Sequence, residues 1–101
     1  MSVLIITTVK GNTAKFPQSL TERAGEYEKI GADARTKGAI HHQFGIGDGI
    51  VVIVDEWETI EQFQQFFSNP ELQAFIGTVG GDTSSPPQVI VSEATHSADQ
   101  F

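Results

Sequence analysis

The 101-residue chain contains no cysteine and few basic side chains. The lack of cysteine excludes disulfide bonds, thiolate metal sites and a cysteine nucleophile. Lysine and arginine together number 6 against 13 aspartates and glutamates, which gives a net charge of −7. Because so acidic a chain repels phosphate backbones, we expect no nucleic-acid partner.

Long apolar runs are also missing from the sequence. The first residues are apolar only from Val3 to Ile6, without a basic leader or a small-residue cleavage site, so we expect no signal peptide. No run approaches the roughly 18 apolar residues of a membrane-spanning helix. We therefore expect a cytoplasmic protein without membrane contact. Its 39% hydrophobic content is typical of a globular chain and predicts one domain over residues 1–101, with a core from about 3 to 94 and a tail over 95–101.

Short runs of β-branched and apolar residues predict four strands. The glycine-rich segment between the second and third runs predicts an antiparallel hairpin, because parallel neighbours need a long crossover. Residues 80–87 have the composition of a loop. The predicted strands are Val3–Val9, Ala39–Phe44, Ile50–Trp57, and Val89 to about Ala94.

Two helical segments are predicted from capping patterns and from apolar residues at helical spacing. Ser19 and Glu22 have the form of a capping box, which starts the first helix at Leu20, and Gly38 ends it. Thr59 and Gln62 form the second box. Asn69 and Pro70 then begin a second piece of that helix.

The order strand, helix, strand, strand, helix, strand predicts an α+β fold of the ferredoxin-like βαββαβ type, with a four-stranded antiparallel sheet and both helices on one face. The strand Ile50–Trp57 is apolar on both faces, as is Val3–Ile6. Leaving such side chains in water forgoes roughly 1.5–3 kcal/mol each. Because the chain has no further helices, we expect a second copy to cover the open face, which makes a homodimer.

These features resemble the dimeric α/β-barrel superfamily, and in particular its antibiotic-biosynthesis-monooxygenase-like group. The resemblance rests on the order of elements, on the doubly apolar strands, on Asp55-Glu56-Trp57 and on the segment Phe66-Phe67-Ser68-Asn69-Pro70-Glu71-Leu72. It covers Val3 to about Ala94 and implies a dimeric α/β barrel. Members of this superfamily include cofactor-independent quinol or anthrone monooxygenases, haem-degrading oxygenases and lactone isomerases, so the fold does not fix the activity.

The chain departs from its relatives on the second helix. Many relatives carry histidines at the positions of Phe66 and Glu71, and a haem-degrading relative has an axial histidine in this region. Here no histidine lies between His42 and His96. We therefore expect no haem, no other cofactor and no metal.

His41 and His42 are the polar residues most suited to chemistry. Neighbours on a strand point to opposite faces, so the two cannot bind one metal together. His42 shares its predicted face with Ile40 and Phe44, which favours His42 as a general base beneath the helices. A hydrogen-bonded structural histidine is the alternative, because no orienting partner is evident. Asp55 and its acidic neighbours are interpreted as a helix-terminus cluster.

Aromatic side chains predict a pocket for a flat ligand, although an ordinary core is the alternative. Three hypotheses follow. The first is a cofactor-independent monooxygenase acting on a quinol-like aromatic. The second is a non-catalytic ligand-binding or interaction module of the same fold, and the third is a small lactone isomerase or cyclase. The expected pocket residues are Tyr27, His41, Trp57, Phe63, Phe66, Phe67 and Phe75.

Overall fold

Four antiparallel strands form one sheet in the order β2-β3-β1-β4 in the computed structural model, which describes residues 1–82 and 84–101. The strands are β1 (Val3–Lys10), β2 (Ala39–Ile46), β3 (Ile50–Trp57) and β4 (Gln88–Glu93). The predicted hairpin between β2 and β3 is confirmed, and its turn is closed by the Gly47 amide, which donates to the Ile50 carbonyl at 2.9 Å.

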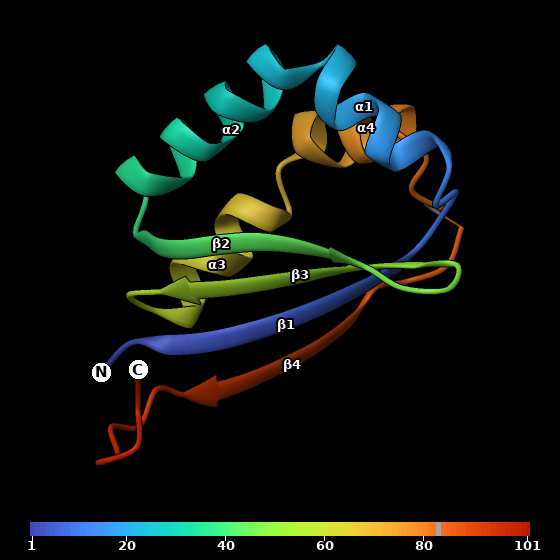
Figure 1. Ribbon diagram of the computed structural model, residues 1–101. Helices are drawn as coiled ribbons and strands as arrows, with labels where there is room; N and C mark the ends of the chain where they lie inside the picture. Colours follow the sequence, from blue (N-terminus) through green and yellow to red (C-terminus); the bar gives the residue numbers. More distant parts are fainter. Residues whose placement is uncertain (83) are drawn as a thin grey trace.

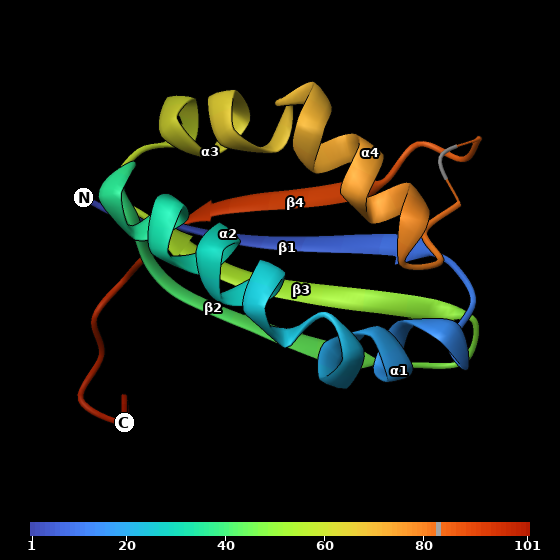
Figure 2. The ribbon, with the colours of Figure 1, turned by 90° about the horizontal axis from the view of Figure 1, so that it is seen from above.

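Each of the two predicted helices is broken once into two pieces. The first comprises α1 (Lys15–Glu22) and α2 (Ala24–Thr36), and the second comprises α3 (Ile60–Phe67) and α4 (Pro70–Thr78). The helices α1 to α4 lie on the same face of the sheet, and α2 descends from its junction with α1 to the start of β2 (Figure 1). Seen from above, α1 follows the β2 side, whereas α3 and α4 follow the β4 side (Figure 2). This arrangement is the predicted α+β ferredoxin-like fold.

The start of the first helix differs from the prediction. The helix begins at Lys15, and Ser19 lies buried inside α1, where its hydroxyl donates to the Phe16 carbonyl at 2.6 Å. The backbone amides of Ala14 and Lys15 donate instead to the Asn12 side chain, both at 2.9 Å. The capping box at Ser19 was therefore wrong, because Asn12 satisfies the first amides further upstream.

The other predicted caps are confirmed. The Thr59 hydroxyl accepts from the Gln62 amide, and the Gln62 side chain accepts in return from the Thr59 amide. The Asn69 side chain accepts from the Glu71 amide at 2.9 Å, with Pro70 at the first position of α4. Of the predicted loop over 80–87, residue 83 lies outside the described residues.

Buried side chains gather in two clusters between the helices and the sheet. Ile5, Ala34, Trp57 and Phe63 form one, and Phe16, Val51 and Val79 form the other. No helix in the described part of the chain is both long and apolar enough to span a membrane.

Within the described residues, no helix covers the opposite surface of the sheet (Figure 1). The exposed large apolar side chains on this surface include Leu4, Ile6, Val54 and Ile90. Register places Ile6 beside Val54 and Ile90, and Leu4 lies one row away. These side chains remain 41% to 64% exposed in the single chain. We call this surface the open face, defined by Leu4, Ile6, Val54 and Ile90.

Candidate functional site

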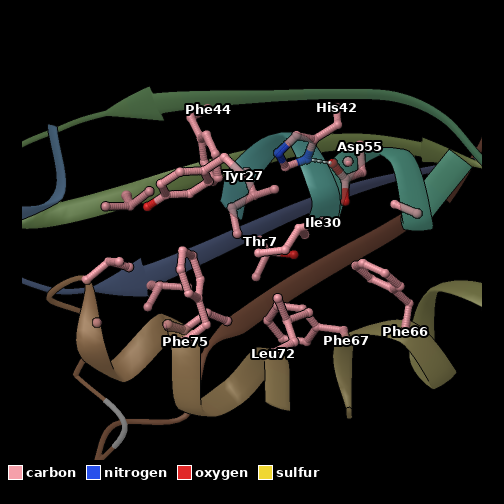
Figure 3. A pocket seen from close by; sticks show the side chains of 18 of the residues that line it. Thr7, Tyr27, Ile30, His42, Phe44, Asp55, Phe66, Phe67, Leu72 and Phe75 are labelled. Atoms are coloured by element: carbon pink, nitrogen blue, oxygen red, sulfur yellow. Dashed lines mark hydrogen bonds and ion pairs between the residues drawn. The ribbon is translucent and has the colours of Figure 1, made fainter. Parts of the chain in front are cut away.

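A cavity of about 330 Å³ lies between the helices and the sheet. Its volume is at the lower end of the range for small-molecule sites, roughly 300–1,000 Å³. All four helices and the strands β1, β2 and β3 contribute side chains to its wall, which is mostly apolar (Figure 3). We call this space the helix–sheet cavity. Its aromatic lining consists of Phe16, Tyr27, Phe44, Trp57, Phe63, Phe66, Phe67 and Phe75.

Most of the residues predicted for the pocket do line the helix–sheet cavity. Phe66 and Phe67 stand in its wall and leave the space open. The predicted residues found there are Tyr27, His42, Trp57, Phe63, Phe66, Phe67 and Phe75. His41 is not among the lining residues: it pairs with Glu56, whereas His42 pairs with Asp55, so the two histidines point to opposite faces of the sheet.

A β-bulge at the start of β2 changes which residues share a face. Ala39 pairs with Trp57 and His41 pairs with Glu56, so Ile40 is the extra residue. As a result Ala39, His42 and Phe44 line the helix–sheet cavity. Ile40, 53% exposed, is absent from that wall, which corrects the expectation that it shares a face with His42.

His42 has an orienting partner in Asp55. The Nδ1 atom of His42 lies 2.6 Å from Oδ1 of Asp55, and the indole Nε1–H of Trp57 donates to Oδ2 of Asp55 at 3.2 Å. Asp55 is 7% exposed and Trp57 is 1% exposed. A buried carboxylate needs such donors, because losing its hydration without replacing it is costly. The three side chains form a hydrogen-bonded row across one wall of the helix–sheet cavity.

The role of Asp55 was missed at the sequence level, where the acids were interpreted as a helix-terminus cluster. A usable signal was present in the hairpin itself. His42 lies four residues before Ile46 and Asp55 lies four residues after Val51, the two residues that pair next to the turn, and in an antiparallel hairpin such residues face each other. Thr7, whose side chain also faces the cavity, carried no comparable signal in the sequence (Figure 3).

Aromatic rings pack edge to face at the other end of the cavity. The Tyr27 ring lies 6.0 Å from that of Phe44 and 5.1 Å from that of Phe75, both nearly perpendicular. The Tyr27 hydroxyl lies 2.8 Å from the Ser19 hydroxyl. Burial raises the pKa of the Tyr27 phenol above its ordinary value, and the hydrogen bond with Ser19 opposes this rise.

Arg23 links the α1–α2 pair to the α3–α4 pair, which we call the two helical arms, near the aromatic end of the helix–sheet cavity. It stands at the break between α1 and α2, and its Nη1 donates to the Thr78 hydroxyl at 2.7 Å. Its guanidinium carbon lies 4.5 Å from the centre of the Phe75 ring, which is cation–π geometry. These contacts tie α4 to the α1–α2 junction.

Within residues 1–82 and 84–101, no three histidine or carboxylate side chains gather closely enough to hold a metal ion. The chemistry that this site offers comes from the His42–Asp55 pair, the hydroxyls of Thr7 and Tyr27, and the aromatic wall.

Comparisons with known proteins give structural matches only. No protein-family model matches the sequence, and neither does the sequence of any curated protein. A monooxygenase from the gene ActVA-Orf6 of Streptomyces coelicolor, solved in complex with the ligand Nanaomycin D, has a TM-score of 0.65 at 15% identity. That match covers 99% of this chain and 93% of the other.

Two further solved structures extend the comparison. SnoaB, a cofactor-independent oxygenase from Streptomyces nogalater, has a TM-score of 0.57 at 12% identity and covers 98% of both chains. A conserved protein from Methanosarcina mazei Go1 has a TM-score of 0.61 at 9% identity and covers 94% of both chains. These matches establish a shared fold along nearly the whole chain.

Proposed function

We propose that this chain, which has the ferredoxin-like fold of the antibiotic-biosynthesis-monooxygenase-like proteins, is a cofactor-independent monooxygenase that acts on a small quinol-like aromatic. The observation that carries the proposal is a single histidine–carboxylate pair on the wall of a mostly apolar cavity that is rich in aromatic rings. The shared fold with a monooxygenase and with a cofactor-independent oxygenase supports it.

The shape and lining of the helix–sheet cavity favour a flat ligand. Edge-to-face and stacked ring packing recur around it, as for Phe63 and Phe67, whose rings stack with centroids 5.4 Å apart. An aromatic ligand would add another ring to such contacts, and aromatic pairs contribute about 0.5–1.5 kcal/mol each beyond area burial. The ring hydroxyl of a quinol would lie against His42.

The proposed reaction needs no electron source besides the substrate. His42 takes the proton from a ring hydroxyl, which makes the ring electron-rich enough to reduce dioxygen. One oxygen atom forms a new C–O bond at a ring carbon, which loses its hydrogen, and the other oxygen leaves as water. The quinol thus becomes a hydroxyquinone and supplies all the electrons. The apolar wall keeps bulk water away from the intermediate.

We propose further that the protein works as a homodimer whose copies cover each other's open face. Four large apolar side chains on one sheet surface are more than a single chain leaves in water without cost, roughly 1.5–3 kcal/mol for each fully buried one. The open face of a second copy offers an apolar surface of the same extent. A two-fold axis then makes each contact twice.

Oxygen uptake tests the catalytic proposal. The protein is incubated with a series of quinols, and uptake by the native chain is compared with uptake by His42→Ala and His41→Ala. Loss of the base should lower the rate about 10²–10⁴-fold in His42→Ala. His41→Ala is the matched control, because His41 is the chain neighbour of His42 but its side chain points to the opposite face of the sheet. Equal rates in the native chain and His42→Ala would refute the proposed role of His42.

A non-catalytic ligand-binding module is the second candidate. It is favoured by Phe66 and Glu71, which stand where many relatives carry histidines. Trp57 is the single tryptophan of the chain and lines the cavity, so quenching of its fluorescence reports binding directly. Quenching by quinols without any oxygen uptake would favour this second function over the first.

A further inference from the structure

The hydrogen bonds around Asp55 have a fixed direction. The indole Nε1–H of Trp57 can only donate, and it donates to Oδ2 of Asp55. An ionised carboxylate can only accept. Oδ1 of Asp55 therefore also accepts, and the atom facing it at 2.6 Å, Nδ1 of His42, carries the hydrogen.

This direction determines the state of the second ring nitrogen of His42. A neutral imidazole has one N–H and one bare nitrogen. With the hydrogen on Nδ1, the bare nitrogen is Nε2. Figure 3 shows the second ring nitrogen turned away from Asp55, on the side of Tyr27 and Phe44, where both residues line the cavity.

We propose that Asp55 is a positioning residue that keeps Nε2 of His42 bare and that Trp57 holds the orientation of the side chain at position 55, so that the helix–sheet cavity selects ligands presenting a hydroxyl or N–H hydrogen to His42. The proposal rests on the proposed function only in taking this cavity as the ligand site. Phenols and enols fit this requirement. Their methyl ethers and the corresponding quinones, which only accept hydrogen bonds, do not.

The substitution Asp55→Asn inverts the arrangement without changing the size of the side chain. Trp57 can only donate, so it takes the amide oxygen, and the amide nitrogen then faces His42. Nδ1 of His42 must accept there, so the hydrogen moves to Nε2. His42 then presents a donor to the cavity in place of an acceptor.

Trp57→Phe removes the indole N–H donor and so separates the contribution of Trp57 from that of Asp55. In this single variant the carboxylate of Asp55 still accepts from Nδ1, so Nε2 stays bare. In the double variant Asp55→Asn/Trp57→Phe, nothing fixes the amide, and its oxygen can turn to His42. The His42 tautomer with the hydrogen on Nδ1 should then reappear in the double variant, alongside the tautomer with the hydrogen on Nε2. Glu56→Gln is the matched control, because Glu56 neighbours Asp55 but pairs with His41 on the opposite face.

Nitrogen-15 NMR of the histidine ring reads the two tautomers directly. The spectra are recorded at about pH 9, where an ordinary histidine is neutral, and the His42 signals are identified by their loss in His42→Gln. Expected results are a bare Nε2 in the native chain, in Trp57→Phe and in Glu56→Gln, and a bare Nδ1 in Asp55→Asn. A bare Nδ1 in the native chain overturns the proposal. An identical spectrum for Asp55→Asn and the double variant overturns the part assigned to Trp57.

Calorimetric binding of 2-naphthol and 2-methoxynaphthalene tests ligand selection. The native chain should prefer the naphthol about tenfold, the effect of one hydrogen bond, and Asp55→Asn should lose this preference. Equal affinities in the native chain overturn the selection. The oxygen-uptake assay is independent of both measurements. If the native chain shows a bare Nε2 on His42 but no oxygen uptake, only the proposed monooxygenase activity is refuted. If it shows uptake but a bare Nδ1, only the positioning role is refuted.

Discussion

The two faces of the sheet differ in what covers them, although both are rich in apolar side chains. On one face, residues such as Ile5 and Trp57 lie at 0% and 1% exposure beneath the helices and beside a cavity. On the other, Ile6 and Ile90 are 41% and 64% exposed. Strand β1 shows the contrast most directly, because Ile5 and Ile6 are neighbours in the chain. The covered face holds the hydrogen-bonded pair His42–Asp55, whereas the apolar side chains of the open face remain exposed.

The contrast indicates that one side of this sheet is covered by the chain itself, whereas the other is left exposed and is the surface that the proposed dimer would cover. Hydrophobic burial would drive both folding of the covered face and association through the open face, at roughly 25 cal/mol for each Å² of apolar surface removed from water. Matched substitutions on the two faces can therefore separate the contribution to folding from the contribution to association.

Ile90→Lys should produce the largest effect, the loss of the proposed dimer. Ile90 lies on the edge strand β4, next to Ile6 on the open face, and a charge there would be buried twice in a two-fold assembly, where unpaired buried charges are costly. Sedimentation should show dimers for the native chain and monomers near 10.9 kDa for the variant. Val89→Lys is the control, because Val89 has a similar place in β4 but faces the other way. A native chain that sediments as a monomer at micromolar concentration would refute the dimer.

Ile5→Ala should come next, with a loss of about 2–5 kcal/mol in the free energy of unfolding, typical of a fully buried aliphatic side chain. Ile6→Ala should cost less than about 1 kcal/mol in a dilute monomeric sample, because its side chain is partly in water already. Urea unfolding at low and high protein concentration measures both. If the dimer forms, the cost of Ile6→Ala grows with concentration and that of Ile5→Ala does not. Equal costs in the monomer would contradict the assigned faces.

Titration of Tyr27 should show the smallest effect and tests how dry the covered face is. Burial raises the pKa of this phenol above its ordinary value of 10.0. Because it is the single tyrosine, the ultraviolet absorbance of the folded chain reports it alone. The unfolded chain loses the phenol proton first, so the free energy of unfolding should fall as the pH rises above about 10. Tyr27→Phe should lack this decrease. A midpoint at or below the ordinary value would argue for a wet cavity.

Much of the fold could be predicted from local patterns. Strand β3 has the predicted bounds, and the caps at Thr59 and Asn69 were confirmed because each depends on residues within one turn of helix. The Ser19 pattern has the same form and failed, since Asn12 had already satisfied the first amides of an earlier helix. A local motif cannot show which of two competing starts the chain adopts.

The site was harder to predict, because it depends on contacts across strands. The aromatic wall follows from helical spacing and was anticipated as a set. The pairing of His42 with Asp55 depends on the hairpin register, and the place of Ile40 depends on a bulge that nothing in the residues Ala39–Phe44 signals. The break at Ser68–Asn69 in the second predicted helix was indicated by Asn69 and Pro70, whereas the break at Arg23 in the first predicted helix had no signal in the sequence.

The two breaks in the helical arms bear on which substitutions can change the size of the cavity. They allow each arm to arch over the cavity instead of lying flat on the strands (Figure 1). The His42–Asp55 pair belongs to the hairpin, whereas side chains such as Ile30 and Leu72 belong to the arms. Substitutions in the arms can therefore resize the chamber while the hairpin register that aligns the pair stays intact. In the proposed monooxygenase, substitutions on the helices would therefore change the size of the accepted ligand, while the pair proposed to react with it stays on the hairpin.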